Sequence, residues 1–100
     1  LREFLYVDDL ADGLIFLAEN YNDIEPINIG SGLELSIKEL AQKIKVITGF
    51  KGKIKFDKSF PDGVMRKILD IKKIKKLGWE PKFNIDESLK MTFDWFVKNN

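Results

Sequence analysis

Two stretches in the first half of the chain have apolar residues at the spacing of an amphipathic helix. From Leu10 the apolar positions are 10, 14, 17, 18 and 21, and Asp8 and Asp9 just before them suit the positive end of a helix dipole. The second stretch follows Ser36, which forms a capping-box signature with Glu39, and a glycine at position 49 ends it. The pattern predicts one helix from Leu10 to residues 20–22 and another over residues 36–49.

Two further helices are predicted in the second half. A short one has apolar residues at positions 71, 74 and 77, with Asp70 placed to cap it and Gly78 to end it. The last one begins with a second capping signature, Asn84 with Glu87. Its apolar face comprises Leu89, Phe93, Phe96 and Val97, with Trp95 alongside.

Four short segments have the composition of strands. Residues 3–7 and 26–30 are rich in aromatic or β-branched side chains, and residues 53–57 alternate between polar and apolar. Residues 66–70 are a further candidate for a short strand. Strand, helix and strand across residues 26–57 predict a βαβ unit with parallel strands and a right-handed crossover. The predicted fold class is therefore α/β, with residues 3–7 and 66–70 as a second strand pair.

Composition narrows the possible chemistry. The 100 residues include no cysteine and no histidine, which excludes disulfides, zinc modules and Cys- or His-dependent hydrolysis. No apolar run approaches the roughly 18 residues that span a bilayer. The net charge is 17 − 16 = +1, yet residues 1–50 hold 4 basic and 9 acidic side chains, whereas residues 51–100 hold 13 and 7. The basic half suggests an anionic partner, either a nucleic acid or a small phosphate ligand.

The chain carries no complete catalytic or cofactor motif. Gly30-Ser31-Gly32 lies between a predicted strand and a predicted helix, the context of a dinucleotide-binding turn. Position 35 is leucine instead of the third glycine, although Asp57 stands where the acidic residue of that motif could be. An ordinary turn is the favoured interpretation. Neither Tyr6 nor Tyr21 has a lysine four residues later, and no nucleophile or carboxylate pair is evident, so no catalytic residue is predicted.

Basic residues follow the loop at residues 58–63. Lysines at positions 72, 73, 75 and 76 could contact nucleic-acid phosphates, but no aromatic residues are interleaved with them, so a solvated helix face is favoured. Arg66 and Lys67 differ from these lysines, because they lie just after a Pro-Asp-Gly loop, where side chains can converge on a ligand.

Four motifs together are more specific than any one of them. They are Arg-Glu-Phe-Leu-Tyr-Val-Asp-Asp-Leu-Ala (2–11), Ile-Asn-Ile-Gly-Ser-Gly (27–32), Leu-Gly-Trp-Glu-Pro (77–81) and Trp-Phe (95–96). This set resembles the C-terminal part of the extended short-chain dehydrogenases/reductases, the NAD(P)-dependent nucleotide-sugar epimerases, dehydratases and reductases. Within that superfamily, Pro-Asp-Gly-Val-Met-Arg-Lys-Ile-Leu-Asp (61–70) is most similar to the GDP-L-fucose synthases.

The resemblance implies a set of substrate-binding residues. Arg2 would contact the diphosphate of the nucleotide sugar, a role that suits the fork of a guanidinium group. Asp62 would accept hydrogen bonds from the GDP portion, and Lys67, with Arg66 as the second choice, would supply positive charge beside it. Tyr6 departs from the histidine that is common at its position in that family. No catalytic, cofactor-binding or metal-binding residue is implied within the 100 residues.

The resemblance also implies an organisation. Residues 1–100, which begin at Leu1 and not at a methionine, would be the C-terminal substrate-binding part of a GDP-L-fucose synthase-like 3,5-epimerase and 4-reductase. They would hold a partial Rossmann-like βαβ unit, a small substrate-binding subdomain and C-terminal helices. The N-terminal NADP-binding domain would be absent, so we expect this chain alone to bind no cofactor and to be inactive.

The full-length parent would be a cytoplasmic homodimer that uses NADP(H), binds the GDP-sugar GDP-4-keto-6-deoxy-mannose and has no nucleic-acid or membrane partner. Two alternatives stay open. One is the C-terminal part of a UDP- or dTDP-sugar epimerase or dehydratase, and the other is a small basic nucleic-acid-binding domain.

Overall fold

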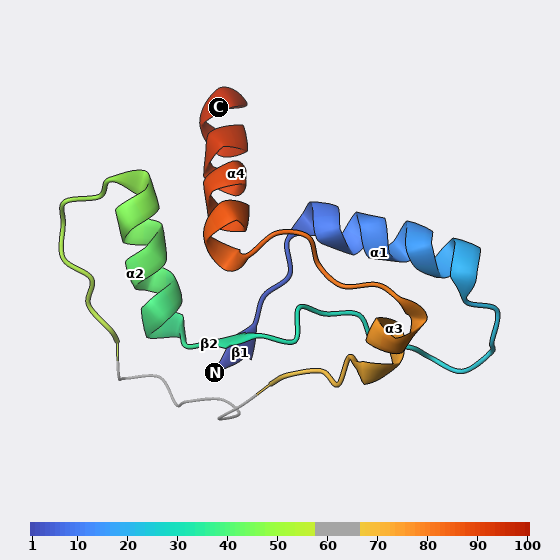
Figure 1. The fold of residues 1–100 in the computed structure, drawn as a ribbon. Helices are drawn as coiled ribbons and strands as arrows, with labels where there is room; N and C mark the ends of the chain where they lie inside the picture. Colours follow the sequence, from blue (N-terminus) through green and yellow to red (C-terminus); the bar gives the residue numbers. More distant parts are fainter. Residues whose placement is uncertain (58–66) are drawn as a thin grey trace.

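The computed structural model of the chain describes residues 1–57 and 67–100. Helices and a small sheet follow one another along these residues, as Figure 1 shows. The elements are β1 (Arg2–Glu3), α1 (Val7–Asn20), β2 (Glu34–Leu35), α2 (Ile37–Thr48), α3 (Lys72–Leu77) and α4 (Ile85–Lys98). The mixture of helices and a short sheet fits the predicted α/β class.

Helices α2 and α4 begin at the predicted caps. Helix α1 begins at Val7 and not at the predicted Leu10, so that Asp8 and Asp9 lie in its first turn, and the N-cap residue of α3 is Ile71 and not the predicted Asp70. The hydroxyl of Ser36 accepts a hydrogen bond from the backbone N–H of Glu39 at 3.0 Å, and Gly49 ends α2 in the left-handed conformation at φ 72°. At the start of α4, Asn84 and Glu87 form a reciprocal capping box, with N···O distances of 2.8 and 3.3 Å. Such caps satisfy backbone groups that the first turn of a helix leaves without partners, so short sequence motifs suffice to predict them.

The predicted βαβ unit is wrong for the described part of the chain. Residues 26–30 and 53–57 are not strands there. A strand requires a neighbour that supplies ladder hydrogen bonds along its backbone. Residues 26–30 make a side-chain contact instead, in which Asn28 Nδ2 donates to the carbonyl oxygen of Asp70 at 3.2 Å.

Strand β1 pairs with two neighbours, one on each edge. Strand β2 is antiparallel to it, with Arg2 opposite Leu35 and Glu3 opposite Glu34. On the other edge Arg2 forms a parallel bridge with Lys67, and the backbone N–H of Lys67 donates to the carbonyl oxygen of Leu1 at 3.2 Å. Among the described residues, the predicted pairing of residues 3–7 with 66–70 is therefore replaced by a single bridge of Arg2, which precedes the predicted strand, to Lys67.

The hydrophobic core lies between α1, α3 and the segments next to them. Ile71, Ile74 and Trp79 are its buried members, and Leu5, Phe16, Leu17, Ile27 and Ile29 pack against them. Gly13 in the middle of α1 permits this packing, because a Cβ there would collide with the side chain of Ile29 and lie 2.9 Å from the Trp79 ring. The close approach of α1 to the Trp79 indole therefore requires glycine at position 13, although glycine is a poor helix former.

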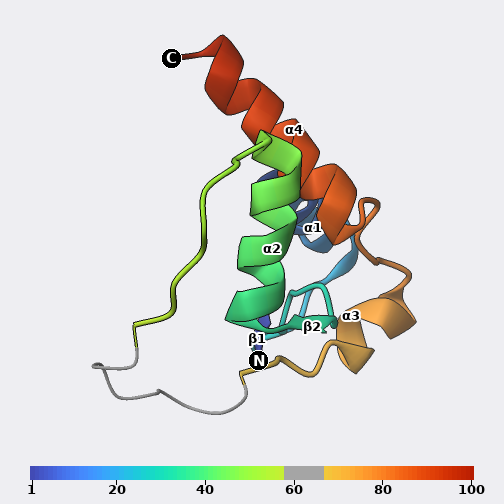
Figure 2. The same cartoon turned by 90° about the vertical axis from the view of Figure 1, so that its left-hand side faces the viewer.

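The molecule is open. Helices α2 and α4 lie side by side on one side of the sheet, and α1 and α3 lie on the other (Figures 1 and 2). The Cα radius of gyration is 16.2 Å, whereas a compact domain of about 100 residues has a value of about 13 Å. Large apolar side chains are more than half exposed on α1 (Leu14, Ile15) and α4 (Trp95, Phe96).

Candidate functional site

The structure brings together two of the four predicted substrate-binding residues. Arg2 and Lys67 are bridged across neighbouring segments, which places their backbones about 4.8 Å apart in the hydrogen-bonding direction. Arg2 is half-buried and Lys67 is exposed. Arg2 Nη1 donates to the carbonyl oxygen of Leu1 at 2.8 Å. Because a guanidinium group carries five N–H donors, others remain for a ligand.

The other two predicted residues, Asp62 and Arg66, lie outside the described residues, which stop at Asp57 and resume at Lys67. Their proposed roles therefore remain predictions. The part of the site that the structure describes is a pair of cations, a guanidinium and an ammonium. Such a pair is suited to an anion with several oxygens, such as a diphosphate.

The Gly30–Gly32 turn is not arranged as a phosphate cradle. The backbone N–H of Gly32 donates to Glu3 Oε2 at 2.7 Å. Gly30 lies against the same carboxylate, and a Cβ on Gly30 would collide with Glu3 Oε1. A side-chain carboxylate thus takes the donor that a pyrophosphate would need, which favours the ordinary turn.

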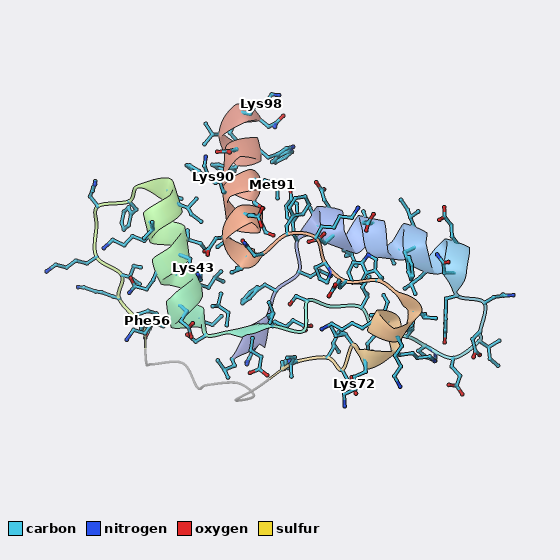
Figure 3. All side chains as sticks on the ribbon, in the orientation of Figure 1. Lys43, Phe56, Lys72, Lys90, Met91 and Lys98 are labelled. Carbon is cyan, nitrogen blue, oxygen red and sulfur yellow. The ribbon has the colours of Figure 1, made fainter. Side chains whose placement is uncertain are left out.

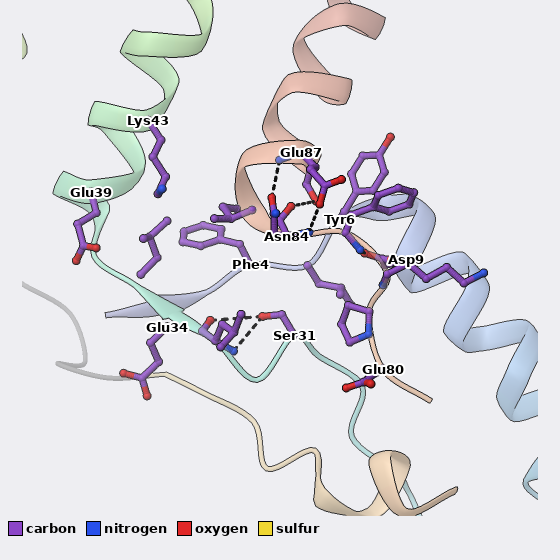
Figure 4. A pocket seen from close by; sticks show the side chains of 18 of the residues that line it. Phe4, Tyr6, Asp9, Ser31, Glu34, Glu39, Lys43, Glu80, Asn84 and Glu87 are labelled. Carbon is purple, nitrogen blue, oxygen red and sulfur yellow. Dashed lines mark hydrogen bonds between the residues drawn. The ribbon is translucent and has the colours of Figure 1, made fainter. Parts of the chain in front are cut away.

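A cleft of about 730 Å³ separates α2 and α4 from residues 80–83 and from the chain that follows β1 (Figure 4). Its floor is partly apolar. Its charged lining comprises Asp9, Glu34, Glu39, Glu80 and Glu87, against Lys43, Lys75 and Lys82. The excess of carboxylates disfavours a diphosphate here. Arg2 and Lys67 do not line this cleft, so it is separate from the cation pair.

One wall of the cleft is fastened by an ion pair. Lys43 Nζ on α2 lies 2.9 Å from Asp86 Oδ1 in the first turn of α4. Figure 3 shows Lys43 on α2, beside α4, which carries Lys90 and Met91. The pair joins the two helices and leaves Lys43 already neutralised.

Two aspartates of α1 hold the connector between α3 and α4. Asp9, which is buried, accepts hydrogen bonds from the backbone N–H groups of Lys82 at 3.0 Å and Phe83 at 3.4 Å. Asp12 accepts from Trp79 Nε1 at 3.0 Å and lies 3.4 Å from Lys82 Nζ. The indole hydrogen bond, followed by the lysine, lowers the pKa of Asp12 against the opposing effect of desolvation.

Tyr6 occupies the position where the resembling family commonly has histidine. Its ring meets Phe83 edge-on, with centroids 5.7 Å apart. Desolvation, with the carboxylates of Asp8 and Asp9 adding to it, raises the pKa of Tyr6 above its ordinary value.

One of the α3 lysines is engaged within the protein. Lys73 Nζ donates to Tyr21 Oη at 2.8 Å and lies 4.0 Å from Glu25 Oε2. The hydrogen bond that Lys73 donates to Tyr21 is the main cause that raises the pKa of Lys73. Lys72, by contrast, extends from the lower edge of the molecule in Figure 3. An internal partner for one of the four lysines weakens the case for a nucleic-acid surface.

Two classes of feature are absent from residues 1–57 and 67–100. None of their helices is both long and apolar enough to cross a membrane. The same residues hold no group of three or more acidic side chains placed to bind a metal ion.

The chain is similar to several known proteins, although no protein-family model matches it. It is 52% identical over 99 residues to the probable GDP-L-fucose synthase 1 of Oryza sativa subsp. japonica. It is 50% identical over 99 residues to GDP-L-fucose synthase 1 of Arabidopsis thaliana. The chain is thus similar to the C-terminal part of GDP-L-fucose synthases. The matches cover 99% of this chain, which spans 30% and 31% of the length of the two relatives.

Solved structures of other sugar-nucleotide enzymes also match the chain. A GDP-6-OMe-4-keto-L-xylo-heptose reductase from C. jejuni matches with a TM-score of 0.89 at 38% identity, over 99% of this chain and 31% of that one. The GDP-mannoheptose C4 reductase from Campylobacter jejuni with NADP bound matches with a TM-score of 0.81 at 38% identity, over 96% and 31%.

A UDP-glucose 4-epimerase from Thermotoga maritima with UDP-glucose matches with a TM-score of 0.85 at 35% identity, over 96% of this chain and 31% of that chain. The fold therefore occurs in proteins named for GDP-sugars and in one named for a UDP-sugar. It does not by itself identify the nucleotide base.

Sequence reasoning missed Glu3, Asp9 and Asp12. The helix dipole explained Asp9 together with Asp8, and Asp12 was not singled out, whereas Asp9 and Asp12 bind the distant residues 79–83. The available signal for Glu3 was its alternation with Arg2 in a strand, which places the two side chains on opposite faces. Nothing in the sequence indicates which segment would meet each carboxylate.

Proposed function

We propose that residues 1–100 are the GDP-sugar-binding C-terminal part of an NADPH-dependent reductase and epimerase of the GDP-L-fucose synthase type. The observation that carries this proposal is the similarity to GDP-L-fucose synthases along 99% of the chain at up to 52% identity. The bridge between Arg2 and Lys67 supports it, because the bridge puts two cations from distant parts of the sequence beside one another. The parent protein is proposed to be a cytoplasmic homodimer.

In this proposal the residues of the chain bind the remote, non-reacting end of the substrate. The Arg2 guanidinium would hold two phosphate oxygens, and Lys67 would neutralise further charge. Asp62 would accept hydrogen bonds from the GDP portion, with Arg66 as an additional cation. Binding energy from this end would fix the position of the sugar at the reacting centre.

The described residues do not fit NADPH. The Gly32 N–H is occupied by Glu3, and the same part of the chain shows no other glycine-rich turn at the start of a long helix. When bound, NADPH supplies the hydride that reduces the 4-keto group. We propose that the cofactor and the acid–base groups lie in the remaining length of the parent protein. The purified 100-residue chain should then oxidise no NADPH, and detectable oxidation would overturn this division of labour.

Affinity measurements on the full-length protein that contains this chain test the nucleotide assignment. Calorimetric titration with GDP, UDP and dTDP should give the tightest binding for GDP. Arg2→Ala should weaken GDP binding about 10- to 100-fold, because a hydrogen bond to a charged group contributes about 1.5–3 kcal/mol. Lys67→Ala should weaken it less, and Lys98→Ala, which removes an exposed charge on α4, should have no effect.

The two alternatives predict different results. Tightest binding of UDP or dTDP would assign the chain to another class of sugar-nucleotide enzyme, an option that the match to a UDP-glucose 4-epimerase keeps open. Retention on DNA or RNA with a steep salt dependence would favour a nucleic-acid-binding domain. Either result would replace the GDP-sugar proposal.

A further inference from the structure

We infer that Glu3 is a positioning residue for Arg2, because its carboxylate fixes strand β1 to the turn that leads into β2. This inference rests on the proposed function, in which Arg2 holds the phosphates of the nucleotide. It adds a residue with no direct contact to the ligand.

The first contact is a hydrogen bond to a charged acceptor. Glu3 Oε2 lies 2.7 Å from the backbone nitrogen of Gly32, in a partly buried position. The carboxylate also lies directly against Gly30, where a Cβ would collide with it. A charge-assisted bond with close packing on one side holds a side chain in one place better than a solvated surface contact does.

The contact closes a small ring of interactions. The Gly30–Gly32 turn runs directly into β2, and β2 pairs with β1 through Arg2 opposite Leu35. The path therefore leads from β1 through the Glu3 side chain to the turn, along the chain to β2, and back to β1 through the ladder. Gly32 takes a positive φ of 74° in this turn, a conformation that glycine adopts at no steric cost.

Such reinforcement is needed because the sheet is very small. Each strand has two residues, and an isolated two-stranded pair is marginally stable at best in water. Glu3 lies directly opposite Glu34 in the ladder, an arrangement of like charges that is itself unfavourable. The Gly32 N–H offsets this by taking up part of the charge of Glu3.

The consequence for Arg2 follows from strand geometry. Successive side chains of a strand point to opposite faces of the sheet. When Glu3 is fixed on one face, the direction of the Arg2 side chain on the opposite face is fixed as well. Arg2 is also the residue that bridges to Lys67. A change at Glu3 should therefore disturb the whole cation pair without removing any charge from it.

Three substitutions of Glu3 and one control in the full-length protein separate this role from a general effect of charge. Glu3→Gln keeps an oxygen acceptor within reach of Gly32 but removes the charge, and should bind GDP within about threefold of wild type. Glu3→Asp keeps the charge but withdraws the acceptor by one methylene group. We expect Glu3→Asp and Glu3→Ala to weaken GDP binding about tenfold. Glu19→Ala removes an exposed carboxylate of α1 and should change nothing.

A double-mutant cycle supplies the deciding measurement. In the Arg2→Ala background, Glu3→Asp should cause no further loss of GDP affinity, because the group through which it acts is gone. Hydrogen exchange of the Lys67 amide should be faster in Glu3→Asp than in wild type and unchanged in Glu19→Ala. Equal exchange rates, or additive losses of affinity, would overturn the inference.

The outcomes distinguish this inference from the proposed function. If Arg2→Ala weakens GDP binding while Glu3→Asp binds like wild type, the positioning role is wrong and the proposed function stands. If the wild-type protein does not bind GDP, the proposed function and this role fail together. If Glu3→Ala does not fold, Glu3→Asp and Glu3→Gln still give the comparison.

Discussion

Two carboxylates in this chain are fixed by backbone N–H groups of distant segments and not by basic side chains. Glu3 accepts from Gly32, and Asp9 accepts from Lys82 and Phe83. Burying a charge is costly unless hydrogen bonds compensate for the lost water, and no buried side-chain polar atom in the described part of the chain lacks a hydrogen-bond partner. These carboxylates therefore act as clamps that set the relative positions of segments far apart in the sequence.

Asp12 gives this arrangement a dependence on pH. Its folded-state pKa is lowered, mainly by the hydrogen bond from Trp79 and then by Lys82. A lowered pKa contributes stability above the unfolded-state value of about 3.9, and that stability is lost as the pH falls through the folded-state value. Thermal unfolding from neutral pH to about pH 3 should show a fall in Tm that is smaller in Asp12→Asn than in wild type.

The control for this prediction is Glu19→Gln, which changes an exposed carboxylate on the same helix. Its Tm should follow the wild-type curve. An Asp12→Asn curve that also follows the wild type at acid pH would show that the bonds from Trp79 and Lys82 do not depend on the charge of Asp12.

Helices and strands of this chain differ in how far local sequence determines them. The caps at Ser36 and Asn84 are contacts between residues three apart, so the sequence alone predicts both helix starts. A strand depends on its neighbour, and the described residues pair β1 with residues 34–35 instead of joining 26–30 to 53–57. Alternation of polar and apolar residues at 53–57 indicates an extended chain but cannot supply the partner.

Gly13 shows how packing can oppose helix propensity. Alanine stabilises a helix interior by about 1 kcal/mol relative to glycine, so propensity alone predicts that Gly13→Ala is stabilising. The Cβ would collide with Ile29 and approach the Trp79 ring, and such overpacking costs about 1–3 kcal/mol. We expect Gly13→Ala to be destabilising by urea unfolding, while Ala18→Gly, at an exposed position of α1, loses about 1 kcal/mol through propensity.

If Gly13→Ala instead raised the urea midpoint, the close approach of α1 to the Trp79 indole would be wrong. The m-value should stay unchanged in both variants, because neither alters how much surface is exposed on unfolding.

The open shape of the whole molecule explains why its apolar surface is large. The longest extent is 49 Å and the shortest is 19 Å, and aromatic side chains at the end of α4 are more than half exposed. Extended apolar patches on a protein surface mark places where another part of the same chain, or another protein, packs. The match to only 30% of the length of a relative is consistent with such a cover.

The 100-residue chain by itself should therefore self-associate. Sedimentation velocity should show a weight-average mass that rises with concentration, because apolar surface is removed from water in the associated state. Ile15→Lys and Trp95→Lys, which place charge on two exposed apolar positions, should reduce the association, and Lys98→Ala should not. A monomer at every concentration would contradict the prediction.

The candidate site was only partly predictable. Motifs such as Arg2 to Ala11 identify the family resemblance. The resemblance selected Arg2, whereas Lys67 was also indicated by its place after the Pro-Asp-Gly turn. Their proximity could not be derived from spacing, since it depends on a parallel bridge between residues far apart in the sequence. Glu3 was missed for the same reason, because its partner Gly32 lies 29 positions away.

NMR titration of the isotope-labelled full-length protein with GDP tests the central proposal most directly. The largest chemical-shift changes should occur together at Arg2, Lys67 and Asp62, with smaller changes at Glu3 and Gly32. The lysines of α3 should show none. Changes confined to the acidic cleft beside α2 and α4, or to the α3 lysines, would contradict the assignment of Arg2 and Lys67 as the phosphate-binding pair.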